Sequence, residues 1–182
     1  MSQASIRFAM LQLALAGAVG AGLWLSFPGW RLGRISERLR AEYPDVPEIT
    51  AAELVGSLAS PQGAKPLLLD VRGPEEFAFS HLVGAQRLTL GDELNPAELP
   101  ADHDASIVVY SSTGERSAAF ARRLRQAGYR NAVTLEGGIV RWANEGWPLT
   151  NGKELTTQVH PGNAETARLL KEAHRAELKA AP

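Results

Sequence analysis

Three short and almost wholly apolar runs follow one another along the middle of the chain, and a helix-like segment follows each of them. The runs are LLLDV (67–71), SIVVY (106–110) and NAVTL (131–135). They lack the polar–apolar alternation of a strand with one face in water, and are typical of strands covered on both faces. This order predicts an α/β fold, with an open parallel sheet and helices on both faces.

The helix-like segments begin and end at recognisable residues. Thr50 precedes AAELVGSL, and Glu53 stands three residues further on, which is the pattern of a capping box. Two later helices are expected to end at Gly128 and Gly146, because glycine most readily adopts the left-handed conformation that closes a helix.

Residues 1–27 are predicted to be a separate membrane anchor. The stretch Phe8–Phe27 has no charged residue, and about 20 helical residues cross a hydrocarbon core of about 30 Å. A cleaved signal peptide is the alternative, because Ala16-Gly17-Ala18 has the small–x–small pattern of a cleavage site. Apolar residues continue well past that site, which favours an uncleaved span.

Residues 28–45 are interpreted as a basic juxtamembrane connector. By the positive-inside rule, its arginines place the main domain of a single-pass membrane protein on the cytoplasmic side. A signal-anchor or secreted orientation is the alternative. The arginines are Arg31, Arg34, Arg38 and Arg40.

Composition excludes several kinds of chemistry. The chain has no cysteine, which excludes disulfides, thiolate metal sites and thiol catalysis. Its formal net charge of −1 provides no general attraction to nucleic acid. We therefore predict no metal site, no cofactor and no nucleic-acid partner.

The loop SSTGERS, which follows the second apolar run, is the candidate functional site. In an open parallel sheet, ligands bind beyond the carboxyl ends of the strands. If the loop curls at the start of the next helix, unpartnered backbone N–H groups and the helix dipole favour an anion. The predicted anion-binding loop is Ser111, Ser112, Thr113, Gly114, Glu115, Arg116 and Ser117.

Three stretches, in order, resemble the motifs of the rhodanese family. SSTGERS is similar to the active-site loop Cys-x-x-Gly-x-Arg-Ser, with Ser111 in the position of the cysteine. LLLDVRGPEEFAFSHLVGA (67–85) is similar to the signature that precedes that loop. LEGGIVRWANEGWPL (135–149) resembles the C-terminal motif. The resemblance covers residues 46–150, the size of one rhodanese-like domain.

The resemblance implies a sulfurtransferase, in which a cysteine takes sulfane sulfur from a donor such as thiosulfate and carries it as a persulfide. Ser111 occupies that catalytic position without a thiol, and no other cysteine can replace it. We therefore predict a binding or regulatory module without sulfurtransferase activity. Its expected partners are the membrane, through the N-terminal helix, a protein that the sequence does not name, and a small anion such as thiosulfate, sulfate or phosphate.

Three alternatives remain for the function, one of which is a structural spacer whose loop neither binds nor reacts. The protein is a thiosulfate-type sulfurtransferase if the serine is an inactivating substitution of a native cysteine. It is a hydrolase if Ser111 acts as an oxygen nucleophile, which requires an adjacent base.

The remaining predictions concern the surroundings of the loop. Asp70, Arg72 and Glu76 belong to the family signature and are interpreted as a supporting hydrogen-bond and ion-pair network. Residues 151–182 are predicted to be a loop followed by a helical tail, 164–181.

Overall fold

The computed structural model describes residues 28–61, 64–89, 91 and 94–177. The predicted span Phe8–Phe27 lies outside these residues. No helix within the described ranges is both long and apolar enough to cross a membrane.

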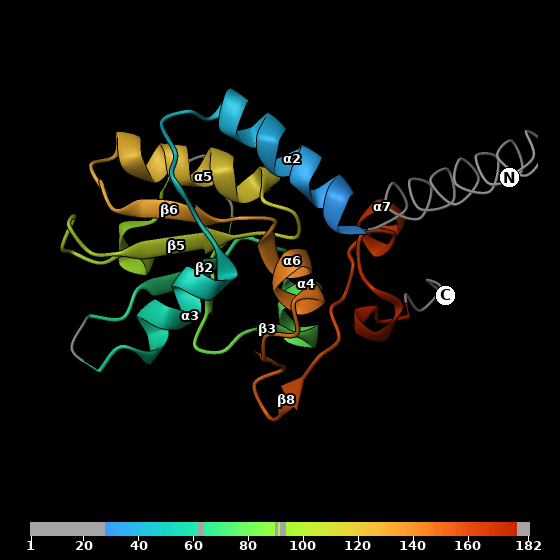
Figure 1. The fold of residues 1–182 in the computed structure, drawn as a ribbon. Coiled ribbons are helices and arrows are strands. Elements are labelled where there is room, and N and C mark those ends of the chain that lie inside the picture. The colour runs from blue at the N-terminus through green and yellow to red at the C-terminus, as the bar shows by residue number, and fades with distance from the viewer. Residues whose placement is uncertain (1–27, 62–63, 90, 92–93, 178–182) are drawn as a thin grey trace, which may run out of the picture.

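A parallel sheet forms the centre of the fold (Figure 1). Its five strands have the order β1-β6-β5-β2-β4. The three predicted apolar runs form its three central strands, so the predicted parallel sheet is confirmed. In sheet order the strands are Glu48–Ile49, Ala132–Leu135, Ile107–Tyr110, Leu67–Asp70 and Gln86–Arg87.

Helices cover both faces of this sheet, as predicted (Figure 1). Successive strand residues point to opposite faces, and each face has its own core. Leu69 and Val109 pack with α5, whereas Leu68 and Val108 pack with α3 and α6. The helices are α2 Pro28–Glu42, α3 Ala51–Ala59, α4 Pro74–Phe79, α5 Glu115–Gln126 and α6 Gly138–Asn144.

The predicted helix ends are confirmed. Thr50 Oγ1 accepts the N–H of Glu53 at 3.2 Å, and the Glu53 carboxylate accepts the N–H of Thr50 at 2.9 Å. Gly128 and Gly146 follow α5 and α6 with φ angles of 102° and 84°.

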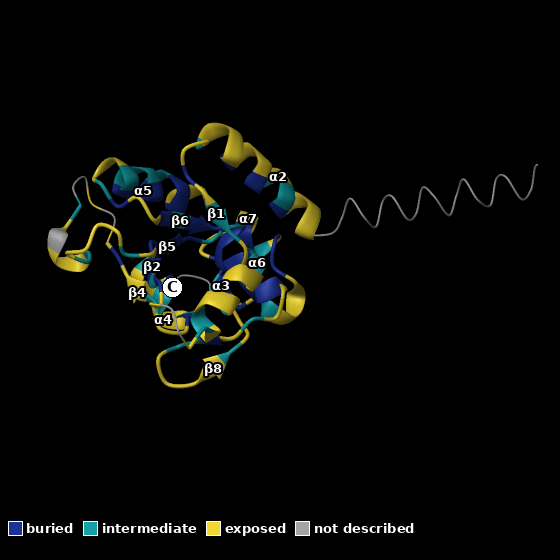
Figure 2. Ribbon diagram, turned by 60° about the vertical axis from the view of Figure 1, so that its left-hand side comes forward, coloured by how far each residue is buried: buried dark blue, intermediate teal, exposed yellow. Residues whose placement is uncertain are grey.

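The segment described from sequence as a connector is a helix that packs on the domain. α2 lies beside α5 and is buried along one stripe (Figure 2). Arg38 pairs with Glu115, and Arg40 pairs with Glu48 and Glu136. The packed structure therefore includes residues 28–42, which precede the part of the chain that resembles the family. The buried residues of α2 are Leu32, Ser36 and Leu39.

The tail differs from the single helix predicted for residues 164–181. Helix α7 is one turn long, Ala164–Ala167, and a 3-10 turn follows at Glu172–His174. Between them, Leu169 and Leu170 are buried in the core. Burial of these adjacent leucines outweighs the helical propensity of the run, which is a weak preference by comparison.

A small antiparallel sheet connects the tail to the rest of the domain. Its three strands have the order β3-β7-β8. They comprise His81–Leu82, Leu149–Thr150 and Leu155–Thr156. This sheet brings the chain that follows residue 156 back toward α4 and the 111–117 loop.

Candidate active site

The 111–117 loop lies at the carboxyl end of β5, the middle strand of the parallel sheet. A pocket of about 370 Å³ opens beside it. Ligand sites in open α/β sheets are expected at this edge. The pocket is lined by Glu76, Ser111, Ser112, Thr113, Glu115, Arg116, Gly162, Asn163 and Thr166.

The loop leaves most of its backbone N–H groups without an acceptor among the described residues. Gly114 is the exception, because its N–H donates to Ser111 Oγ at 3.2 Å. Gly114 is the N-cap of α5 and has a φ angle of 107°. The loop therefore leads directly into the first turn of this helix. An open helix N-terminus of this kind favours an anion. The unpartnered groups belong to Ser112, Thr113, Glu115, Arg116 and Ser117.

Ser111 is buried, with 1% of its surface exposed. Its Oγ lies 3.5 Å from Ser117 Oγ. Ser117 Oγ in turn donates to Gly114 O at 2.9 Å and lies 2.7 Å from Thr134 Oγ1. Within the described residues no histidine hydrogen-bonds to Ser111. Its hydrogen-bond partners, Ser117 Oγ and the N–H of Gly114, include no carboxylate either, so no general base contacts this hydroxyl within the described part of the chain.

The N-terminus of α6 holds the carbonyl groups of the loop. The N–H of Ile139 donates to Ser111 O at 3.0 Å, and the N–H of Val140 donates to Ser112 O at 3.1 Å. Gly138, with a φ angle of 57°, allows this approach. A Cβ at Gly138 would lie 2.3 Å from Ser111 O and 2.7 Å from Ser112 O.

Gly138→Ala is therefore expected to displace the loop. Overpacking costs typically about 1–3 kcal/mol, and a left-handed backbone adds roughly 1–2 kcal/mol for a residue with a Cβ. Chemical denaturation should show a loss of about 2–5 kcal/mol.

Gly56→Ala in α3 is the matched control, because nothing lies within 4 Å of a Cβ there. Helix propensity predicts that it stabilises the protein by up to about 1 kcal/mol. Equal stabilities for the two variants would show that the close approach of Gly138 to the loop is not required.

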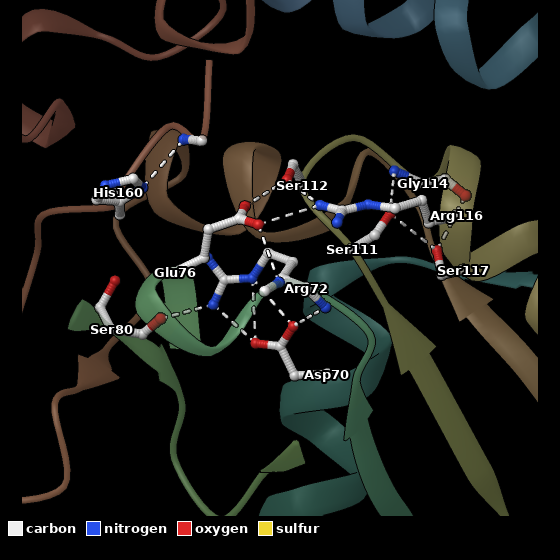
Figure 3. A network of polar contacts seen from close by, with 12 residues as sticks. Asp70, Arg72, Glu76, Ser80, Ser111, Ser112, Gly114, Arg116, Ser117 and His160 are labelled. Carbon is white, nitrogen blue, oxygen red and sulfur yellow. Dashed lines mark hydrogen bonds and ion pairs between the residues drawn. The ribbon is translucent and has the colours of Figure 1, made fainter. Parts of the chain in front are cut away.

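Glu76 connects α4 to the loop (Figure 3). Its Oε1 accepts from Ser112 Oγ at 3.1 Å, and its Oε2 accepts from the N–H of Gly73 at 3.0 Å. Arg116 Nη2 lies 3.4 Å from Glu76 Oε2 and 3.1 Å from Ser112 Oγ. The structure thus brings Glu76, Ser112 and Arg116 together at the pocket.

Asp70 and Arg72 form a pair at the end of β2 (Figure 3), and neither residue lines the pocket. Both side chains have 0% exposure, and Nη2 lies 2.7 Å from Oδ2. Burial alone would lower the pKa of Arg72, but its hydrogen bonds and charge interaction with Asp70 outweigh burial and raise that pKa. Arg72 Nη2 also donates to Ser80 O at 2.6 Å.

Tyr110, at the end of β5, lies next to this pair. Its hydroxyl accepts the N–H of Leu82 at 3.1 Å, and Arg72 lies 5.9 Å from the centre of its ring. Burial is the main cause that raises the pKa of Tyr110 well above its ordinary value. These residues act on the site by fixing the strand end from which the loop starts.

Sequence reasoning missed several residues of the site. Thr134 was a detectable exception, as a polar residue within an apolar strand. Gly162, Asn163 and Thr166 lie in a segment whose sequence, HPGN followed by AET, indicates only a turn and a helix start. Their proximity to the loop depends on tertiary packing.

The parallel sheet and the loop at its edge define the class, and comparison with known families agrees. Residues 50–145 match the rhodanese-like domain. Because this match covers more than half of the chain, the protein belongs to the rhodanese-like family. Ser111 stands in the position of the catalytic cysteine of that family, and the predicted family is confirmed.

Individual relatives carry sulfurtransferase names. A sulfurtransferase of Allochromatium vinosum is 34% identical over 105 residues, which cover 57% of this chain and 94% of that protein. The probable adenylyltransferase/sulfurtransferase MoeZ of Mycobacterium tuberculosis is 42% identical over 105 residues, 55% of this chain. The chain spans 25% of MoeZ and about half of a Synechocystis relative.

Among solved structures, the chain is similar to the rhodanese-like domain of the Anabaena protein Alr3790. The TM-score is 0.51 at 27% identity, over 57% of this chain and 78% of that one.

Proposed function

We propose that this protein is a membrane-anchored binding module, in which a rhodanese-like domain binds a small anion at the 111–117 loop without transferring sulfur. The observation that carries this proposal is the side chain of Ser111. It is buried in a loop with open N–H groups, where the family places its sulfur-carrying cysteine. A hydroxyl cannot hold a persulfide, and the chain contains no thiol.

Charges around the pocket limit the affinity for an anion. Glu76 and Glu115 line it together with Arg116. Each carboxylate is paired, Glu76 with Arg116 and Glu115 with Arg38. Attraction therefore comes mainly from the loop N–H groups and the helix terminus, which contributes about 0.3–2 kcal/mol. Adding one or two charge-assisted bonds gives a Kd on the order of 1 mM.

The proposal is tested on the full-length chain, purified in detergent. Thiosulfate titrated against ¹⁵N-labelled protein should shift the amide signals of the loop and saturate in the millimolar range. Thiosulfate-to-cyanide sulfur transfer by the same preparation should stay at the level of a protein-free control. Absence of the shifts, or measurable transfer, would contradict the proposal.

Glu76→Gln is expected to increase thiosulfate affinity. The substitution removes a negative charge from the pocket and releases Arg116 from its ion pair. Because the Arg116 guanidinium is half-exposed, the gain in the free energy of thiosulfate binding should be about 1 kcal/mol, which corresponds to a roughly fivefold lower Kd. The same NMR titration measures it.

Glu75→Gln is the matched control, because Glu75 is the preceding residue of α4 but does not line the pocket. Its Kd should stay close to that of the unaltered protein. Equal gains from both variants would indicate a general charge effect, and no gain from Glu76→Gln would contradict an anion site at the loop.

The membrane anchor is supported by the uncharged stretch Phe8–Phe27 and by the arginines that follow it. Alkaline carbonate washing of membranes should leave the full-length chain in the pellet. Release into the supernatant would contradict an integral anchor. Protease access to the domain in intact and opened membrane preparations distinguishes a cytoplasmic domain from the opposite orientation.

A further inference from the structure

The pocket has a second wall that lies outside the matched family domain. Gly162, Asn163 and Thr166 line the pocket, whereas the family match ends at residue 145. We call residues 159–176 the C-terminal wall. The matched family domain does not include this segment.

The ends of the C-terminal wall are joined to each other. The N–H of Val159 donates to His174 O at 2.8 Å, and the N–H of Ala176 donates to Val159 O at 3.1 Å. Val159 and Ala176 are buried, with 1% and 4% exposure. The segment therefore forms a closed and packed loop.

Helix α6 fixes the C-terminal wall relative to the 111–117 loop. Asn144 Nδ2 donates to Leu169 O at 2.8 Å, and Asn144 Oδ1 accepts the N–H of Lys171 at 2.8 Å. The other end of the same helix binds the carbonyl groups of Ser111 and Ser112. One helix thus holds both sides of the pocket.

The C-terminal wall also meets the loop network directly. Gly162 has a φ angle of 72°, and a Cβ there would lie 2.9 Å from Glu76 Oε1. Figure 3 shows His160, from the same segment, on the side of Glu76 away from Ser111. The pocket is therefore bounded on that side by backbone in close contact with Glu76.

Two polar groups of the C-terminal wall are available to a ligand. Asn163 Oδ1 accepts the N–H of Thr166 at 2.8 Å. Asn163 Nδ2 and Thr166 Oγ1 have no hydrogen-bond partner among the residues that the structure describes, and both residues line the pocket. An anion on the loop would therefore share the cavity with an amide donor and a hydroxyl that have no partner among the described residues.

The lining offers no hydrocarbon side chain, because every lining residue is polar, charged or glycine. The pocket volume of about 370 Å³ is near the lower end of the roughly 300–1,000 Å³ of small-molecule sites. We propose that the C-terminal wall, through its polar lining, makes the site selective for small, fully polar anions such as thiosulfate over anions that carry an apolar group. This inference rests on the proposed anion binding.

The test compares thiosulfate, a dianion, with benzenethiosulfonate, a monoanion in which an aromatic ring replaces one oxygen atom. Methanethiosulfonate, a monoanion with a methyl group in place of the ring, separates the effect of charge from the effect of the ring. With the full-length chain, thiosulfate should shift the loop amides and the side-chain amide of Asn163. It should also bind at least about tenfold more tightly than benzenethiosulfonate. Thr166→Val, which replaces the hydroxyl with a methyl group of similar size, should weaken thiosulfate binding roughly 2–10-fold. It should weaken benzenethiosulfonate binding less.

Gln158→Ala is the control, because Gln158 is exposed and lies outside the pocket lining. One outcome is that thiosulfate shifts the amide signals of the loop but not that of Asn163, and that Thr166→Val leaves the ratio of the two Kd values unchanged. The C-terminal wall then has no selective role, while anion binding by the loop is still supported.

If thiosulfate shifts neither side of the pocket, anion binding by the serine form fails. The wall is then tested in the Ser111→Cys background, by the rates of sulfur transfer from the two donors. A faster rate with thiosulfate than with benzenethiosulfonate, and a smaller difference in the Thr166→Val variant, would support the selective role of the C-terminal wall. Equal rates for both donors overturn it.

Discussion

Replacing Ser111 with cysteine is expected to turn the chain into a thiosulfate sulfurtransferase. The rate of thiocyanate formation from thiosulfate and cyanide should rise at least about 10³-fold above the unaltered chain, because loss of a covalent nucleophile has effects of that size or larger. The assay measures thiocyanate by its coloured iron complex. Sulfite, the second product, is measured separately.

The physical reason is that the surroundings of Ser111 suit a thiolate. A sulfur at this position would replace the oxygen that accepts the N–H of Gly114, at the open N-terminus of α5. Such positions lower the pKa of a thiol and favour its negative form. The thiolate would attack the outer sulfur of thiosulfate and break its S–S bond, and sulfite would leave. Cyanide would then take the outer sulfur of the persulfide and restore the thiolate.

Ser112→Cys is the matched control for this prediction. Ser112 is the next residue of the same loop and also lines the pocket, but its hydroxyl donates to Glu76. A thiol at position 112 would contact both Glu76 and Arg116, whose opposite charges offset each other. It would also lack the N–H of Gly114, which donates to position 111. Only Ser111→Cys should therefore be active. Turnover by the unaltered chain would show that position 111 does not decide activity. A folded but inactive Ser111→Cys would show that the loop has diverged in more than one atom.

Much of this site could be predicted because the information is local. The apolar run 106–110 determines a buried strand, and the loop that follows must lie at the carboxyl edge of a parallel sheet. The glycine and helix start that shape the loop are adjacent in sequence. The opposite wall could not be predicted in this way. Its position depends on the burial of Leu169 and Leu170 and on the hydrogen bond from Asn144 to the carbonyl of Leu169, 25 residues further along the chain.

The difference between local sequence information and tertiary contacts also explains why the packing of α2 was not predicted. The sequence of α2 shows arginines after an apolar span, and a basic connector is the direct interpretation. The structure pairs Arg38 with Glu115 and Arg40 with Glu136, residues far along the chain. Leu39 packs against the loop, where a Cβ on Gly114 would lie 3.1 Å from its Cδ1. Charge pattern alone cannot tell a lipid-facing arginine from one that pairs with a distant carboxylate.

Asp70→Ala is expected to destabilise the protein by about 3–5 kcal/mol, because it leaves a buried guanidinium without its counter-charge. Arg72 has no exposed side-chain surface, and its Nη1 already lacks a hydrogen-bond partner among the described residues. For a chain of this size the melting temperature should fall by roughly 6–20 °C. Urea denaturation gives the free energy, and far-UV circular dichroism gives the melting temperature.

A double variant separates the charge effect from the loss of packing. Asp70→Leu combined with Arg72→Met removes both charges, and buried pairs replaced by apolar side chains are often tolerated. It should lose less stability than Asp70→Ala, although the carbonyl of Ser80 would lose its donor from Arg72. Asp45→Asn breaks the exposed pair with Arg122 and should cost at most about 1 kcal/mol. If Asp70→Ala costs no more than Asp45→Asn, the buried pair does not hold the end of β2. The loop would then be held by its contacts with α6, Glu76 and Thr134.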